Sequence, residues 1–164
     1  MRWKFKSTPT KTAVAHLKSC LGIDEVIATL LAQRGIDSYD AAKAYFRPNL
    51  EQLHDPFLMQ DMDKAVARLQ QAIAQKEPVM VYGDYDVDGT TSVSMLTHFL
   101  RNQGVTATPY IPDRYAEGYG LSKQGIDAAK DANISCFVAL DCGIKAVEQA
   151  AYAASLGIDL IICD

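Results

Sequence analysis

The sequence contains few cysteines and few histidines, four and three of its 164 residues. The cysteines are Cys20, Cys136, Cys142 and Cys163, and no two of them form a Cys-x-x-Cys pair. Neither a zinc site nor a disulfide framework is therefore indicated. Three of the four lie in or beside apolar runs that are typical of strands, so we expect buried thiols.

The chain also lacks a long apolar run and an excess of positive charge. No run approaches the roughly 18 apolar residues of a transmembrane helix, and no apolar segment of a secretory signal follows the basic N-terminus. We therefore expect a cytoplasmic protein without a membrane contact. The net charge of −4 weighs against nonspecific nucleic-acid binding. Residues 1–18 hold five basic residues and no acidic one, and we expect them to be extended or disordered.

What the chain does contain is enough apolar sequence, 49% of its residues, to bury a core. Its length suits one domain, or one domain and a part of another. Apolar residues at helical spacing predict helices over about 23–31, 38–46 and 61–76, with no strand between them. We therefore expect residues 1–76 to form an N-terminal tail and a helical region.

From Val79 onward, apolar strand-like runs alternate with helical patterns. This alternation predicts parallel βαβ units with right-handed crossovers. The fold class is thus α/β, a parallel-sheet αβα sandwich over residues 77–164, preceded by the small helical region. The expected strands are 79–83, 107–111, 135–140 and 160–163, and the expected helices are 89–103, 122–131 and 143–156.

The stretch 79–91 organises this second part. An apolar run ends in three alternate aspartates, Asp84, Asp86 and Asp88, and helical spacing follows Gly89. The carboxylates therefore lie between a strand and a helix, where open α/β sheets bind ligands. Three such groups repel one another unless a divalent cation with a preference for oxygen ligands is bound. The alternative is a solvated acidic turn.

Two further strands also end on an aspartate, Asp141 and Asp164. Parallel strands place their C-terminal ends at one edge of the sheet, so five aspartates from three strands are expected to gather there. Asp141 could instead serve only as the cap of the next helix.

Two known motifs overlap the acidic turn. In an EF-hand loop, Asp84, Asp86 and Asp88 would fill ligand positions one, three and five, but position twelve requires a glutamate and is Met95 here. Residues 86–90 match the Asp-x-Asp-Gly-Thr motif of haloacid dehalogenase-type phosphatases, in which the first aspartate is a nucleophile. That interpretation leaves Asp84 as an unexplained extra carboxylate. We therefore reject the first motif and disfavour the second.

Four segments in order resemble the signature motifs of RecJ-type single-stranded-DNA exonucleases in the DHH phosphoesterase superfamily. The segment 161–164 looks like the start of the Asp-His-His motif, and the two histidines that should follow are not in the sequence. The resemblance therefore implies the N-terminal part of a longer enzyme. The other matching segments are 82–92, 114–122 and 139–144, with leading helical segments at 30–36 and 53–62.

The resemblance implies 5′-to-3′ hydrolysis of single-stranded DNA in repair and recombination, with two Mn²⁺ or Mg²⁺ ions and release of 5′-mononucleotides. It implies Asp86, Asp88 and Asp141 as metal ligands. Asp84 is expected to be a catalytic ligand or to support one. Asp164 is expected to orient the missing neighbours.

Arg114 is the candidate phosphate contact, because a guanidinium binds phosphate oxygens with two hydrogen bonds. The alternative is an ion pair between Arg114 and Glu117. Tyr119 is a candidate for stacking on a base, with ordinary packing as the alternative. Gly118 would let the same loop approach substrate closely.

Two other functions stay open from the sequence. One is a DHH phosphoesterase that acts on oligonucleotides, small nucleotides or pyrophosphate. The other is a non-catalytic relative that serves in DNA binding or assembly. Protein partners cannot be inferred, and we expect the 164 residues alone to be inactive because the ligand set is incomplete.

Overall fold

The structure is a computed structural model that describes residue 4 and residues 6–164. It divides into two compact units, Met1–Asp55 and Pro56–Asp164. None of the helices in the described part of the chain is long and apolar enough to cross a membrane.

Three helices form the first unit. Each begins at a side chain that accepts a hydrogen bond from a backbone N–H of the first turn, supplied by Thr10, Asp24 and Ser38. A small apolar core holds them together, built on Leu17 and Leu31. The elements are α1 (Lys11–Leu21), α2 (Glu25–Ala32), α3 (Tyr39–Phe46) and the short 3₁₀ helix η1 (Leu50–Gln52).

The expectation that residues 1–18 are extended or disordered is wrong from Lys11 onward. Helix α1 is capped by Thr10 and buries Leu17 completely, with Val14 packed against the same core. The two lysines of this helix, Lys11 and Lys18, are exposed, and Val14, Leu17 and Leu21 recur at helical spacing on its buried side. The expectation gave more weight to the basic charge of the segment than to this pattern. Residues 1–3 and 5 of the expected tail lie outside the described residues.

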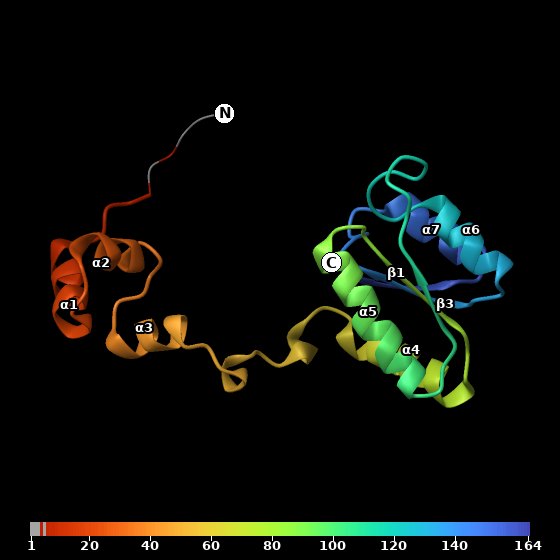
Figure 1. Cartoon of the computed structure of the whole chain (residues 1–164), viewed down its shortest axis with the longest axis horizontal. Helices are drawn as coiled ribbons and strands as arrows, with labels where there is room; N and C mark the ends of the chain where they lie inside the picture. The colour runs from red at the N-terminus through yellow and green to blue at the C-terminus, as the bar shows by residue number, and fades with distance from the viewer. Residues whose placement is uncertain (1–3, 5) are drawn as a thin grey trace. The chain divides into compact units, whose positions relative to one another are not determined.

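The second unit is a four-stranded parallel sheet with strand order β2-β1-β3-β4 (Figure 1). This confirms the predicted α/β class. Most observed bounds lie within two residues of those expected, although helix α7 begins four residues later. The elements are η2 (Pro56–Leu58), α4 (Met62–Gln75), β1 (Val79–Gly83), α5 (Val87–Asn102), β2 (Ala107–Tyr110), α6 (Lys123–Asp131), β3 (Cys136–Leu140), α7 (Val147–Ser155) and β4 (Asp159–Cys163).

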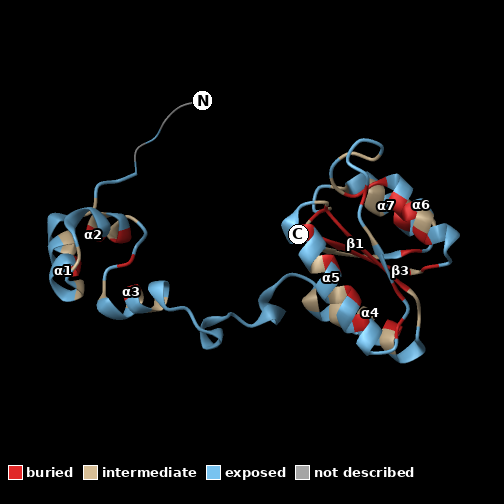
Figure 2. Cartoon of the chain, in the orientation of Figure 1, coloured by how far each residue is buried: buried red, intermediate tan, exposed pale blue. Residues whose placement is uncertain are grey.

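Helices cover both faces of the sheet (Figure 1). Helices α4 and α5 pack on one face against Val79, Val81 and Val138, and helices α6 and α7 pack on the other against Tyr82 and Phe137. Strands β1 and β3 are buried along their whole length, as Figure 2 shows by colour. This explains their almost purely apolar sequences, since neither face meets water.

Helix α4 belongs by packing to the second unit. Ala72 is fully buried, and Leu69 and Ile73 pack against the core beneath β1. The boundary between the compact units therefore falls at 55/56, whereas the sequence indicated a division at 76/77. The sequence missed this because a helix that covers a sheet shows the same apolar stripe as a helix in a bundle.

The cysteines are divided between core and surface. Cys136 and Cys142 are buried, as expected, whereas Cys20 and Cys163 are exposed. Desolvation raises the pKa of Cys136 to about 11 and that of Cys142 to about 12. Both buried thiols are therefore protonated and unreactive at neutral pH.

Arg68 ties helix α4 to two other parts of the second unit. Its Nη2 donates to Glu77 Oε2 at 2.7 Å, and its Nε donates to Asp159 Oδ2 at 2.6 Å. The Arg68 and Glu77 side chains are only 15% and 18% exposed. A charged pair with so little water around it is sensitive to the loss of either partner.

We predict that Arg68→Met destabilises the protein by about 1–3 kcal/mol, because Glu77 is then left half-buried without its counter-charge. Urea denaturation monitored by circular dichroism measures the change. The matched control is Lys64→Met, since the Lys64–Asp61 pair is 76% and 55% exposed. The control should change stability by less than about 0.5 kcal/mol. Equal effects of the two substitutions would contradict the prediction.

Candidate functional site

Asp84 follows strand β1 directly and is the most buried of the five strand-end aspartates. It is 1% exposed, and its Oδ1 accepts a hydrogen bond from the Tyr85 backbone N at 2.8 Å. Its Oδ2 is buried and has no hydrogen-bond partner among the described residues. A buried carboxylate oxygen without a partner is costly, so this atom indicates a position where a ligand would be stabilising.

Asp86 begins helix α5 as its N-cap. Its Oδ1 accepts from the backbone N of Asp88 at 3.0 Å and of Gly89 at 3.1 Å. The helix therefore starts at Val87, two residues before the predicted start, and Asp88 lies in its first turn. Negative charge is stabilised at this end of a helix, so the fold itself supports the acidic residues here.

Asp141 follows strand β3 and has a left-handed backbone conformation, with φ 59°. Its backbone N donates to the carbonyl oxygen of Cys163 on strand β4 at 2.7 Å. The pKa of Asp141 is raised by desolvation and by the charges of Asp86, Asp88, Asp164 and Asp84, in that order. The carboxylates predicted from the sequence therefore do gather at one edge of the sheet.

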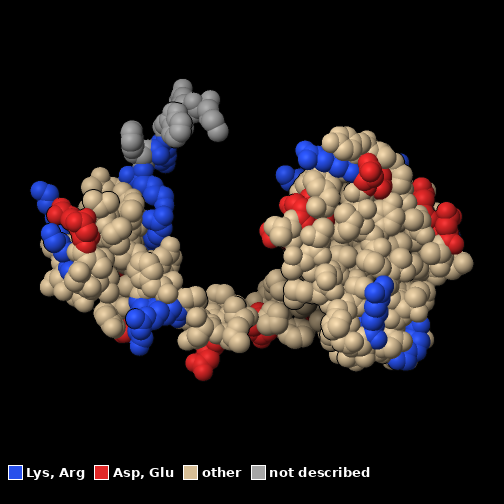
Figure 3. All heavy atoms as spheres, in the orientation of Figure 1, with Lys and Arg blue, Asp and Glu red and all other residues tan. Residues whose placement is uncertain are grey.

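Asp164 follows strand β4 at the same edge. Its Oδ2 accepts a hydrogen bond from the backbone N of Ile144 at 2.9 Å, which ties the segment after β3 to the end of β4. In Figure 3, acidic side chains lie close to the end of the chain that is marked C in Figure 1.

The acidic edge fits a divalent cation in its chemistry but does not complete a binding site. Its donors are carboxylate oxygens, which suit Mg²⁺ and Mn²⁺, and the Asp84 Oδ2 lacks any other partner in the described structure. Yet among the described residues no group of three or more His, Cys, Asp or Glu side chains is arranged to hold a metal ion. The described side chains thus supply part of a coordination set.

The loop 111–121 carries the predicted substrate contacts. The Arg114 guanidinium lies over the Tyr85 ring, 5.4 Å from its centroid, and the Tyr119 ring meets the same ring edge-on at 6.2 Å. Charge from Asp84 is the largest cause that raises the pKa of Tyr119. Arg114 and Tyr119 are therefore brought together next to the acidic turn.

The alternative ion pair between Arg114 and Glu117 does not form among the described side chains, because Glu117 binds other groups. Its carboxylate accepts hydrogen bonds from Tyr110, the backbone of Asp113 and Ser122. Gly118 and Gly120 both have φ 85°, a conformation that other residues rarely adopt. The loop therefore needs glycine at these positions whatever it binds.

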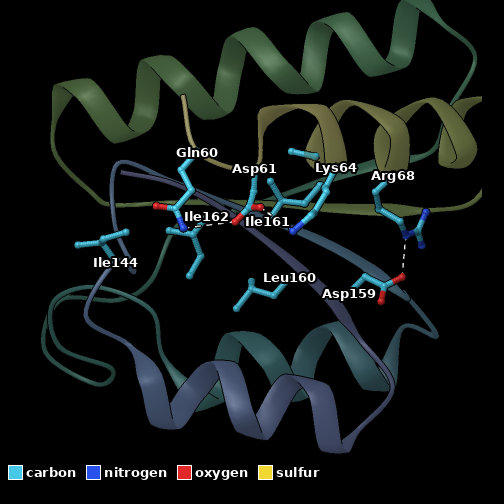
Figure 4. A pocket seen from close by; sticks show the side chains of 10 residues that line it. Gln60, Asp61, Lys64, Arg68, Ile144, Asp159, Leu160, Ile161 and Ile162 are labelled. Atoms are coloured by element: carbon cyan, nitrogen blue, oxygen red, sulfur yellow. Dashed lines mark hydrogen bonds and ion pairs between the residues drawn. The ribbon is translucent and has the colours of Figure 1, made fainter. Parts of the chain in front are cut away.

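A cavity of about 470 Å³ adjoins the acidic edge. It lies between the loop that carries Tyr119, the segment that follows β3, and Asp164. A larger cavity of about 630 Å³ runs along the outer strand β4 (Figure 4). Apolar side chains of Ile144 and β4 line it beside Arg68 and Lys64, and none of the aspartates of the acidic edge does. The smaller cavity is therefore the candidate substrate position.

Sequence reasoning missed Tyr82 and Glu117 as site-building residues. Tyr82 is fully buried in β1, and its hydroxyl donates to the Gly120 carbonyl oxygen at 2.7 Å. Burial raises its pKa to about 12. The sequence signal for this role was the Tyr82 hydroxyl, the one polar side-chain group in the apolar strand β1. A buried tyrosine hydroxyl needs a hydrogen-bond partner, so it points to a contact elsewhere in the fold.

A parallel α/β sheet with aspartates at the C-terminal ends of three of its strands places the protein in a family of known sequence. The sequence model of the DHH family, N-terminal domain, matches residues 78–164 of the chain. The chain belongs to the DHH family, which confirms the resemblance seen in its motifs.

Two similar proteins of this family are both named RecJ. The chain is 40% identical over 164 residues to the single-stranded-DNA-specific exonuclease RecJ of Bacillus subtilis and covers 21% of that protein. It is 35% identical over 104 residues to RecJ of Escherichia coli, covering 63% of this chain and 18% of that protein. The chain thus spans about a fifth of the length of these relatives.

Two solved structures that resemble this chain are also of RecJ. A crystal structure of RecJ from Thermus thermophilus in complex with Mn²⁺ matches with a TM-score of 0.69 and 25% identity over 98% of this chain and 22% of the other. A crystal structure of exonuclease RecJ bound to manganese matches with a TM-score of 0.60 and 31% identity over 65% of this chain and 27% of the other.

We predict that Gly89→Ala disrupts the acidic turn. A Cβ at this position would meet the backbone N of Asp84 at 2.6 Å and also its carbonyl oxygen. Because neither backbone atom can rotate away, β1 and α5 must separate, at a cost of about 1–3 kcal/mol. Urea denaturation measures the loss, and Ser94→Ala on the exposed side of the same helix is the control. Unchanged stability of Gly89→Ala would show that the turn is looser than described.

Proposed function

We propose that this chain forms one part of the metal-dependent phosphodiesterase centre of a single-stranded-DNA exonuclease. One observation carries the proposal. Carboxylates at the ends of three adjacent parallel strands meet at one edge, where desolvation and then their charges raise the pKa of Asp141, while the Asp84 Oδ2 stays buried without a described partner. Such an arrangement is stabilised by cations.

The similar proteins named above support single-stranded DNA as the proposed substrate. These are single-stranded-DNA-specific exonucleases, and two solved structures of RecJ hold manganese. A third, of RecJ from Thermus thermophilus in complex with Mg²⁺, has a TM-score of 0.55 and 25% identity. We extend the exonuclease activity to this chain and propose, as the resemblance of its motifs implies, 5′-to-3′ hydrolysis in DNA repair and recombination. The relatives come from bacteria, in which DNA lies in the cytoplasm, so we propose that location here.

The roles that we propose for the aspartates follow from their positions. Asp86, Asp88 and Asp141 would hold the metal ions, because they lie at the exposed edge. Asp84, beneath them, would bind metal with its free oxygen or support a ligand. Asp164 would orient its neighbours, a role supported by the hydrogen bond that its Oδ2 accepts from the backbone N of Ile144. Bound Mn²⁺ or Mg²⁺ would activate a water and neutralise the charge that develops on the phosphate.

The loop 111–121 would bind the substrate. Arg114 would contact a phosphate, because its guanidinium forms no ion pair with a carboxylate among the described residues and lies over the Tyr85 ring, 5.4 Å from its centroid. Tyr119 would stack on a base beside it. Gly118 would allow the backbone to pass close to the nucleic acid. We also propose that residues 77–164 carry the metal-binding domain and that residues 1–76 are the tail and helical region before it, of which helix α4 packs against the sheet.

A non-catalytic role has one observation in its favour, namely the incomplete ligand set among the described residues. A DHH phosphoesterase that acts on small nucleotides or pyrophosphate is disfavoured by the helical first unit, which also matches the RecJ relatives. Cleavage of single-stranded DNA distinguishes the proposed function from both alternatives.

We predict that the 164-residue chain alone does not digest 5′-labelled single-stranded DNA in the presence of Mn²⁺, because its carboxylates do not complete a metal site. Product formation on a denaturing gel measures this, with full-length Bacillus subtilis RecJ as the positive control. Robust digestion that disappears in Asp86→Ala would show that the ligand set is complete without further residues.

We predict a different result when this chain replaces the corresponding segment of Bacillus subtilis RecJ. Asp86→Ala and Asp141→Ala should each lower cleavage by more than about 100-fold, beyond the range typical for an outer partner of a ligand. Circular dichroism should stay unchanged. Asp131→Ala, on the exposed end of α6, is the matched control and should leave cleavage intact. Near-normal activity of either site variant would refute its assignment as a ligand.

A further inference from the structure

One carboxylate, that of Glu117, gathers an unusual number of hydrogen bonds. The Tyr110 hydroxyl lies 3.1 Å from both of its oxygens, the Asp113 backbone N donates to Oε1 at 2.9 Å, and the Ser122 hydroxyl donates to Oε2 at 2.6 Å. These donors come from the end of β2, the start of the loop and the residue that caps α6. Glu117 therefore connects both ends of the loop 111–121.

Tyr82 adds a second connection from beneath. Its hydroxyl donates to the Gly120 carbonyl oxygen at 2.7 Å and accepts from the Ser122 backbone N at 3.2 Å. Its ring stacks on that of Tyr110, with centroids 5.4 Å apart. The end of the loop is thereby fixed to the central strand β1.

The outer part of this loop has little else to hold it. Tyr115 is 96% exposed and Tyr119 is 74% exposed. Arg114 and Tyr119 both contact Tyr85. The Asp113 Oδ1 accepts from the backbone N of Tyr115 and of Ala116, which shapes one local turn. Few buried apolar contacts and exposed side chains are typical of a segment that opens easily.

We propose that Glu117 is a positioning residue whose carboxylate holds the loop 111–121 so that Arg114 and Tyr119 stay against Tyr85 beside the acidic turn. The importance of this loop for substrate rests on the proposed function. The positioning itself rests only on the hydrogen bonds described above. Glu117 touches neither the acidic edge nor, in the proposed arrangement, the substrate.

The chemistry of the carboxylate explains why a glutamate is needed. Each of these three partners donates to Glu117, and an ionised carboxylate accepts at both oxygens. The Asp113 backbone N can only donate, whereas the two hydroxyls can also accept. A glutamine of the same shape keeps one acceptor oxygen, so at least one hydroxyl would have to reverse its hydrogen bond to accept from the NH₂ group. The carboxylate is also the stronger acceptor, because hydrogen bonds to a charged group are about twice as strong as neutral ones.

The test compares Glu117→Gln with Glu148→Gln in the full 164-residue chain. Glu148 lies exposed in the first turn of α7 and serves as the control. In wild type, the Arg114 Nε–H proton should show an upfield NMR shift from the Tyr85 ring. In Glu117→Gln this shift should be lost, and amides of the loop should exchange with solvent at least about 10-fold faster. Amides of β1 and β3 should keep their exchange rates.

Two results would overturn the proposal. One is an unchanged Arg114 signal with unchanged loop exchange. The other is faster exchange throughout the sheet, which would mean that Glu117 supports the fold in general. If Glu117→Gln does not fold, Tyr110→Phe removes a single donor and should give the loop-specific signature in a weaker form. The absence of that signature in a folded Tyr110→Phe variant counts equally against the proposal.

A binding measurement separates this proposal from the proposed function. Fluorescence anisotropy with a 5′-phosphorylated oligothymidylate is measured on this chain in place of the corresponding segment of Bacillus subtilis RecJ, where Glu117→Gln should weaken binding by the same factor as Arg114→Gln. If wild type binds no oligothymidylate while the NMR signature is present, the positioning stands and the proposed substrate falls. If wild type binds and Glu117→Gln binds equally well, the loop does not need Glu117 and the positioning proposal falls.

Discussion

Repulsion among the carboxylates at one sheet edge is the constraint around which the second unit is built. The parallel register aligns Gly83 with Leu140 and Leu140 with Cys163, so the residues that follow these three strands meet. Their charges cannot be separated without breaking the sheet. The fold offsets the repulsion with backbone N–H groups instead, at the start of α5 and at Ile144. Desolvation, followed by the charges of the other four aspartates, still raises the pKa of Asp141, so these N–H groups do not cancel the repulsion.

The same constraint explains why the sequence was informative about the site. Strands β1 and β3, buried on both faces, have nearly pure apolar runs, so their ends were visible at Asp84 and Asp141. The edge strand β4 is only partly buried, but its apolar run still marked its end at Asp164. Parallel geometry then dictated that these ends lie together. Helix α1 was missed although its cap at Thr10 and its apolar stripe are local signals. The packing of helix α4 against the sheet could not be predicted, because which core a helix joins depends on tertiary contacts that its own pattern does not encode.

The loop 111–121 marks the other limit of sequence reasoning. Arg114 and Glu117 are three positions apart, which suggested an ion pair, yet the guanidinium lies on Tyr85 and the carboxylate binds Tyr110 and Ser122. The contact between Tyr82 and Gly120 joins residues 38 positions apart. Such a contact follows from where β1 and α6 meet, so it becomes visible only once the sheet is assembled.

Asp86 shows how one residue serves both the fold and the proposed site. Only its Oδ1 accepts the two N–H groups that begin α5, so the helix does not consume the whole carboxylate. A cation on the other oxygen would leave the cap intact. Because Gly89 touches the Asp84 backbone, the helix start also fixes the depth of Asp84. Folding of α5 therefore sets the spacing of the acidic turn before any metal binds, and a cation would meet carboxylates that are already positioned.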